Sequence, residues 1–185
     1  DVVQSDYFNN PSAYALQYGT SYEAYNTAVG YQALKGSATI SSNTGIKNTA
    51  LGYQSLQVNT SGSSNTAVGY LSLSANSTGS NNIAVGEEVL KSNTTGSNNT
   101  AIGFEALFSS TGNNNVAIGL QSGSSNVAGS QNTYLGASTS TNNAGYNNST
   151  AIGYQAQIVN SNMIQLGNGS ITDVSTTGNY NTRSE

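Results

Sequence analysis

Short apolar stretches that end in glycine recur along this chain, and longer polar stretches separate them. The first is Asn26-Thr27-Ala28-Val29-Gly30, and eight variants follow. From one closing glycine to the next, the sequence number rises by 22, 17, 17, 17, 16, 17, 17 and 14. A period in this range predicts a solenoid, in which each repeat forms one coil. The repeat residues are Asn26, Asn48, Asn65, Asn82, Asn99, Asn115 and Asn132 at the head of the motif, and Gly30, Gly52, Gly69, Gly86, Gly103, Gly119, Gly136, Gly153 and Gly167 at its end.

Each motif predicts a short β-strand, because the apolar runs are too short for a helix and a glycine interrupts each one. The residues three and one before the glycine, such as Thr66 and Val68, share a face because side chains alternate along a strand. Most of them are β-branched, as strands favour, and the residue between them is usually Ala. We expect the β-branched face to line the interior of the coil, and the Ala face to approach another element closely or to face solvent.

The polar half of each repeat carries a second glycine, which predicts a second place where the backbone turns tightly or takes positive φ. The motif asparagines would form a ladder in stacked coils, each amide bonding the next, although a row of ligand-binding amides is the alternative. The fold class is therefore all-β: a parallel β-roll, or β-solenoid, of about nine coils with a repeat of about 17 residues. The second glycines are Gly45, Gly62, Gly79, Gly96, Gly112, Gly129 and Gly145.

A further apolar row follows the motif glycines and predicts an oligomer. One coil of this size encloses only a thin core, so we infer that another chain covers at least one apolar row. The row consists of Tyr31, Tyr53, Tyr70, Phe104, Leu120 and Tyr154 directly after the glycine, with Leu34, Leu56, Leu73, Leu90 and Leu107 three residues beyond those positions.

Residues 1–25 do not follow the period and are expected to form an N-terminal cap or adaptor, with an aromatic binding patch as the alternative because they hold five tyrosines. Residues 26–167 form the β-roll. Residues 168–185 are expected to form an exit or neck-like segment towards a further domain, with Ile171, Asp173 and Val174 as its anchor.

Charged residues make up only 6% of the 185 residues, and the net charge is −4. Four basic residues are too few for phosphate contacts, so nucleic-acid binding is not expected. No apolar run is long enough to insert into a membrane. Cys and His are absent, which removes disulfides and Cys/His metal sites, and no cofactor is expected.

The repeats resemble a known family. NTAVGYQAL at residues 26–34 and STAIGYQA at 149–156, with TTGSNN-type turns between units, are similar to the β-roll repeats of trimeric autotransporter adhesin heads, the YadA-like heads, which carry an Asn-Ser-Val-Ala-Ile-Gly motif in each coil. Residues 82–86 and 115–119 match that motif most closely. The same repeats occur in fibres of phages and large viruses. The resemblance covers 26–167 and implies a homotrimer of left-handed β-rolls around a common axis.

The resemblance implies a structural and adhesive function: a segment of a homotrimeric fibre, such as a phage or viral tail fibre that contacts the host surface. The expected partners are two further copies, a host-surface receptor or glycan whose contact residues are unknown, and further fibre or stalk domains. The expected location is extracellular, on a virion. The alternative is the head of a bacterial trimeric autotransporter adhesin on the cell surface, which binds matrix or cells.

Two other function classes follow from the residues. A flat β-solenoid face with regular threonines is typical of ice binding, and tyrosine rows can stack on sugars. The repeated threonines alternate onto the side of Val and Ile, which we expect to face inward, and this argues against ice. An enzyme is not expected, because Glu87 and Glu88 point to opposite faces of a strand and no nucleophile pattern is present. The threonines are Thr27, Thr49, Thr66, Thr100, Thr133 and Thr150.

Overall fold

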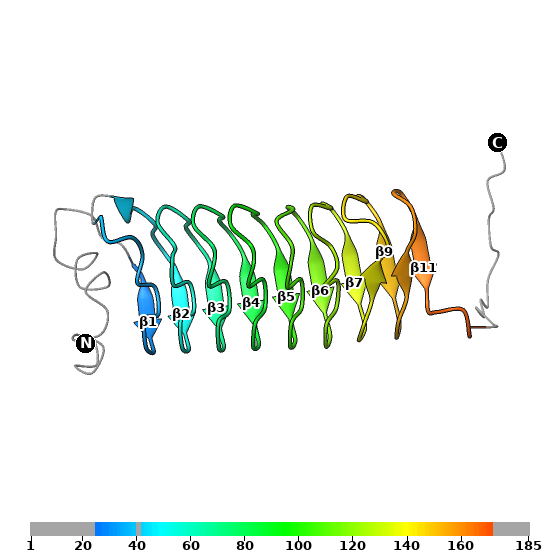
Figure 1. Ribbon diagram of the computed structural model, residues 1–185, viewed down its shortest axis with the longest axis horizontal. Coiled ribbons are helices and arrows are strands. Elements are labelled where there is room, and N and C mark those ends of the chain that lie inside the picture. Colours follow the sequence, from blue (N-terminus) through cyan, green and yellow to red (C-terminus); the bar gives the residue numbers. More distant parts are fainter. Residues whose placement is uncertain (1–24, 40–41, 172–185) are drawn as a thin grey trace.

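The computed structural model describes residues 25–39 and 42–171, which form a β-solenoid (Figure 1). Nine strands make one parallel sheet in the order β1-β2-β3-β4-β5-β6-β7-β9-β11, and β8 and β10 make a second, two-stranded parallel sheet. The described residues contain no α-helix, and hence none that could cross a membrane. The strands are β1 (Thr27–Val29), β2 (Thr49–Leu51), β3 (Thr66–Val68), β4 (Ile83–Val85), β5 (Thr100–Ile102), β6 (Val116–Ile118), β7 (Thr133–Leu135), β8 (Ser140–Thr141), β9 (Thr150–Ile152), β10 (Gln157–Ile158) and β11 (Ile164–Leu166).

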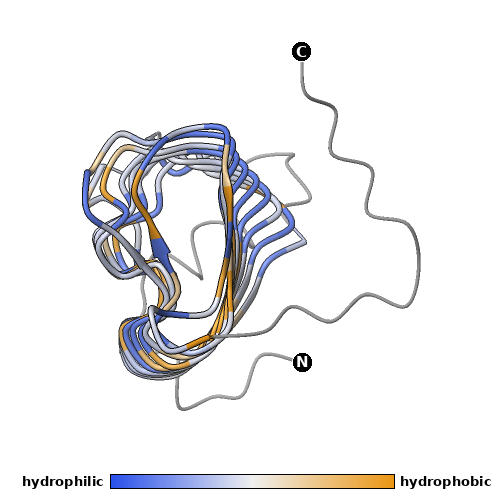
Figure 2. Cartoon of the chain, turned by 90° about the vertical axis from the view of Figure 1, so that its right-hand side faces the viewer, coloured by the Kyte–Doolittle hydropathy of each residue, from blue (hydrophilic) through white to orange (hydrophobic). Residues whose placement is uncertain are grey.

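Neighbouring strands pair without any shift of register. Thr49 lies opposite Thr66, and Ala50 lies opposite Ala67. From β2 to β9, the large-sheet strands begin at sequence numbers that differ by 17, or by 16 between β5 and β6, so the regular part of the solenoid has about seven turns. Viewed along the axis, these coils superimpose (Figure 2). The predicted all-β parallel solenoid and its repeat length are therefore confirmed, but the regular turns number about seven and not the predicted nine.

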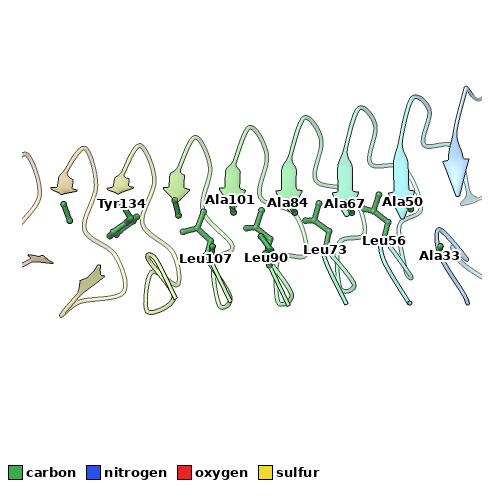
Figure 3. Packing of buried hydrophobic residues seen from close by; sticks show 14 of the residues in the cluster. Ala33, Ala50, Leu56, Ala67, Leu73, Ala84, Leu90, Ala101, Leu107 and Tyr134 are labelled. Carbon is green, nitrogen blue, oxygen red and sulfur yellow. The ribbon is translucent and has the colours of Figure 1, made fainter. Parts of the chain in front are cut away.

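The side of each strand that faces the interior is the reverse of the one expected. The motif alanines, such as Ala67 and Ala84, are completely buried, whereas Val29 is 43% exposed and Ile102 39% exposed. The reason is the width of the coil. Leucines from the opposite wall, such as Leu73, fill the interior, which leaves room for only a methyl group on the strand side (Figure 3).

The leucines four residues after the motif glycines form the other wall of this core. They are 0–2% exposed, so this part of the predicted apolar row lies inside the coil and is not available to another chain. Leu56 takes φ 50 and Gln54 takes φ 54, a region that few residues other than glycine adopt. Cross-coil hydrogen bonds hold this turn: Gln54 N donates to Tyr31 O (2.8 Å), and Leu56 N donates to Ser72 O (3.0 Å). The five core leucines are Leu34, Leu56, Leu73, Leu90 and Leu107.

The two ends of the chain are described only in part. The predicted cap over residues 1–25 lies outside the described residues, except for Tyr25. At the other end, the side chain of Ile171 lies against Gly167, where it fills the space that a Cβ would need. The other two predicted anchor residues, Asp173 and Val174, also lie outside the described residues.

Candidate functional site

The outward face of the large sheet, hereafter the sheet face, carries a continuous row of aliphatic side chains. Each strand contributes the residue before the motif glycine, and strand pairing aligns these residues from one end of the solenoid to the other. Seven of the nine are between 39% and 47% exposed, and Val68 and Val85 are half-buried. Contiguous exposed apolar surface of this kind marks an interaction site. The row is Val29, Leu51, Val68, Val85, Ile102, Ile118, Leu135, Ile152 and Leu166.

The second row on the sheet face holds the repeated threonines. The register places Thr49 opposite Thr66, with Ile83 next in the row. These residues share the side of Val and Ile, as predicted, but that side faces outward. The threonines of β2, β3, β5, β7 and β9 are half-buried, because aligned neighbours flank them. The expectation that the threonines point into the coil is therefore wrong.

An aromatic row borders the sheet face, directly after the motif glycines. The rings of Tyr31 and Tyr53 stack with their centroids 5.3 Å apart and an interplanar angle of 17°, and Tyr53 stacks on Tyr70 at 5.3 Å and 16°. All three are between 43% and 48% exposed. Because the rings cover one another's faces, they present their edges and hydroxyl groups to solvent. Glu87 then interrupts the row before Phe104.

The motif asparagines form a buried ladder between the coils. In a typical coil, Asn82 Oδ1 accepts the N–H of Asn99 (3.0 Å), while its Nδ2 donates to Gly96 O (2.9 Å) and Asn65 Oδ1 (3.1 Å). The predicted contact between amides is present, and slightly shorter hydrogen bonds with the backbone accompany it. Asn48 to Asn132 of this set are at most 1% exposed, so these amides serve the fold and are closed to ligands.

A second asparagine ladder was missed in the sequence. Asn76 Nδ2 donates to Asn59 Oδ1 (2.8 Å) and Asn93 Nδ2 to Asn76 Oδ1 (3.0 Å), and each also donates to the glycine carbonyl three residues ahead. Ser110 takes the next position, and Asn93 Oδ1 is left buried without a hydrogen-bond partner. The signal was available, because Asn59, Asn76 and Asn93 recur with the same period as the motif glycines.

The two sets of glycines are required for different reasons. Gly69 in the motif has φ 132, and a Cβ there would collide with the carbonyl group of Gly86 in the next coil. Gly62 in the polar half does not have a positive φ, so that one of the two predicted alternatives does not apply there. A side chain at Gly62 would nevertheless collide with Gly79 O, so this position needs close approach between coils.

The few charged side chains of the described residues are dispersed. Glu88 forms an ion pair with Lys91 (2.7 Å), Lys91 Nζ lies 5.4 Å from the centroid of the Phe108 ring, and Glu105 accepts a hydrogen bond from Gln121 (2.7 Å). Within residues 25–39 and 42–171, no three acidic, His or Cys side chains are close enough to hold a metal ion.

One buried hydroxyl stands out in the core. Tyr134 occupies the position of the motif alanine in β7 and is completely buried, and its hydroxyl group has no hydrogen-bond partner. Desolvation raises the pKa of this phenol far above its usual value. The ring is therefore a neutral packing element that no ligand can reach.

The surface available for function is thus the sheet face with its aromatic border. No protein-family model, curated protein or solved structure matches this chain in comparisons with known proteins.

Proposed function

We propose that this chain is a structural and adhesive segment of a homotrimeric fibre, such as a phage or viral tail fibre, that contacts a host surface. The observation that carries the proposal is the sheet face, where nine aligned aliphatic side chains face outward and seven of them are 39–47% exposed. Burying such a row against other copies would remove apolar area from water over the full length of the solenoid.

The form of the molecule supports a fibre. Parallel strands spaced by about 4.8 Å build a rod in which each coil adds the same length. The sheet face runs along the rod, so copies packed through it lie side by side and keep both ends free for further domains. The number three comes from the resemblance to the adhesin heads, and the contact face comes from the geometry.

The decisive experiment is the mass of the unheated protein in solution, measured by light scattering at several concentrations. We expect about three times the chain mass of 18.9 kDa. A monomer at every concentration would overturn the proposal, and a dimer would overturn the trimer while leaving the contact face standing. The bacterial alternative, an autotransporter adhesin head, predicts the same mass. It is distinguished by a membrane-anchor barrel encoded downstream in the full gene.

One observation favours a second candidate, ice binding. The threonine row and the aliphatic row both face outward on a regular parallel sheet, so the objection that the threonines point inward no longer holds. The same face serves both candidates, and a chain that binds ice through it must leave it open. Thermal hysteresis in a dilute solution of a monomeric chain would support ice binding, and its absence would exclude it.

Carbohydrate stacking on the tyrosine row is less favoured by the geometry. A sugar ring packs on the face of an aromatic ring, and the faces of Tyr31, Tyr53 and Tyr70 are stacked on one another. The row presents ring edges instead.

A further inference from the structure

The three stacked tyrosines are held in place by the backbone as well as by their rings. Gln54 N donates to Tyr31 O (2.8 Å), and Leu71 N donates to Tyr53 O (2.9 Å), so the turns that carry the rings are hydrogen-bonded from coil to coil. Gln32 Nε2 also donates to the Tyr31 hydroxyl (3.1 Å). Unfolded or mobile tyrosines meet only transiently, whereas these rings remain neighbours as long as the solenoid is folded.

The geometry points to a covalent modification site: neighbouring rings of Tyr31, Tyr53 and Tyr70 are joined as dityrosine by a haem peroxidase with hydrogen peroxide. The centroid distances of 5.3 Å place adjacent rings in contact, and the exposed ring edges leave room for two rings to tilt together as they bond. The inference does not depend on the oligomeric state, because both tyrosines of each pair belong to the same chain.

The reaction balances as a two-electron oxidation. Each phenol loses one electron and one proton, and the unpaired electron of the resulting radical is shared with the ring carbons beside the hydroxyl-bearing carbon. Two such carbons form a C–C bond, and the hydrogen on each then leaves as a proton that returns to the ring oxygen. The pair has lost two electrons and two protons in total, which reduce one hydrogen peroxide to two waters.

Tyr134 and Tyr154 lack this arrangement. Tyr134 is completely buried, so the oxidant cannot reach it. Tyr154 is 62% exposed, but the same position in the preceding coil is Ala137, which offers no ring. The structure thus supplies one stacked set and, in Tyr154, an exposed tyrosine with no ring in the preceding coil, which serves as a matched control.

The bond would act as a staple between adjacent coils. The coils of a solenoid are otherwise held only by noncovalent contacts with their neighbours, so terminal coils can separate first. Links among these tyrosines join the first three coils at the N-terminal end of the sheet. An oxidised chain should accordingly resist unfolding from that end.

The sequence allows a direct test. Trypsin cleavage after Lys47 and Lys91 releases the peptide 48–91, which contains Tyr53 and Tyr70 and no other tyrosine. The folded full chain is treated with horseradish peroxidase and hydrogen peroxide, then denatured, digested and analysed by mass spectrometry and dityrosine fluorescence. We expect a form of this peptide that is lighter by two hydrogen atoms, with a yield that does not change on dilution of the protein.

Three variants separate this result from general oxidation. Tyr53→Phe and Tyr70→Phe should each abolish the lighter form of peptide 48–91, whereas Tyr154→Phe should leave its yield unchanged. The inference is overturned if the peptide is recovered unmodified, or joined only to peptides of other chains, under conditions in which Tyr154 forms links between chains. A monomeric chain that shows the lighter peptide would sustain this inference while refuting the trimer.

Discussion

The ring of Tyr134 occupies the space that a side chain would need at Gly123. A Cβ built on Gly123 would lie 2.7 Å from Cδ2 of Tyr134. Gly123 stands four residues after its motif glycine, where Leu107 stands in the preceding coil, and Tyr134 stands where β1 to β6 and β9 have alanine. The coil with Gly123 therefore lacks a core leucine, and the ring of Tyr134 in the next coil fills the space that the leucine would occupy.

This exchange predicts strong coupling between the two positions. Tyr134→Ala should lower the free energy of unfolding by about 3–5 kcal/mol, because it leaves a cavity. Gly123→Leu should lower the free energy of unfolding by about 1–3 kcal/mol, because the added side chain overpacks the core. Its backbone conformation is compatible with leucine, because Gly123 has φ 64 and Leu107 has φ 50. The double variant restores the alanine and leucine of the common repeat. Its loss in the free energy of unfolding, measured by denaturant unfolding, should therefore be well below the sum of the two single losses. Additive losses would show that the two residues do not compensate.

The motif glycines should tolerate no side chain. Gly69→Ala places a Cβ against the carbonyl group of Gly86 at φ 132, so we expect a loss of roughly 3 kcal/mol or more in the free energy of unfolding. Gly145→Ala is the matched control, since its Cβ would meet only Asn143 Oδ1 at 3.8 Å. Thermal unfolding followed by circular dichroism compares the two. Equal stabilities would refute the requirement for close approach between coils.

The asparagine ladder should be a main source of stability. Asn82→Ala removes the acceptor for the Asn99 N–H and two donated bonds in a fully buried place. At about 1–3 kcal/mol for a buried group left without a partner, the expected loss is at least about 2 kcal/mol. Asn142→Ala, at an exposed side chain in a loop, should change stability by less than about 0.5 kcal/mol. If both variants unfolded at the same denaturant concentration, the ladder would be energetically neutral.

Completing the second ladder should stabilise the protein. Ser110→Asn places an amide beside the unpartnered Asn93 Oδ1, and one added hydrogen bond is worth about 1 kcal/mol. We therefore expect a higher midpoint of denaturation. A lower midpoint would mean that this coil, which is one residue shorter than its neighbours, cannot accommodate the larger side chain.

A charge on the sheet face should prevent assembly without unfolding the chain. Ile118 is 39% exposed and lies in the aliphatic row between Ile102 and Leu135. Ile118→Lys would bury an unpaired ammonium group at every copy of the interface, at a cost of several kcal/mol. Light scattering should then report a monomer with an unchanged circular dichroism spectrum. Val127→Lys, at a residue 42% exposed in a polar loop, should keep the wild-type mass; loss of assembly in both variants would place the contact elsewhere.

The repeat made most of the fold predictable. The repeat length, the strands before the glycines and the stacked asparagines all follow from spacing, because a solenoid gives every coil the same environment. Alternation along a strand shows which side chains share a face, but it does not show which face is inside. Hydrophobicity favoured Val68 over Ala67 as the interior residue, and the width of the coil decided the opposite.

The candidate site was harder to predict for the same reason. Once Val68 and its equivalents are placed outside, the sheet face becomes the available surface, and the leucine row becomes the core. The conformation of Leu56 at φ 50 gave no signal, since leucine rarely adopts it and only the cross-coil hydrogen bonds make it favourable. The exchange between Gly123 and Tyr134 could have been found by aligning the repeats position by position.

Because the strands pair in strict register, the length of the solenoid is proportional to its number of coils. From β2 to β5, each coil presents the next one with a three-residue strand, a motif asparagine and a motif glycine at equivalent positions, so these coils can follow one another in any order. Removing residues 66–82 would join Asn65 to Ile83, which is itself paired opposite Thr66, and would shorten the rod by about 4.8 Å without a mismatch. The length of the solenoid is therefore set by the number of repeats in the chain. Duplication or deletion of one gene segment that encodes a repeat would lengthen or shorten it.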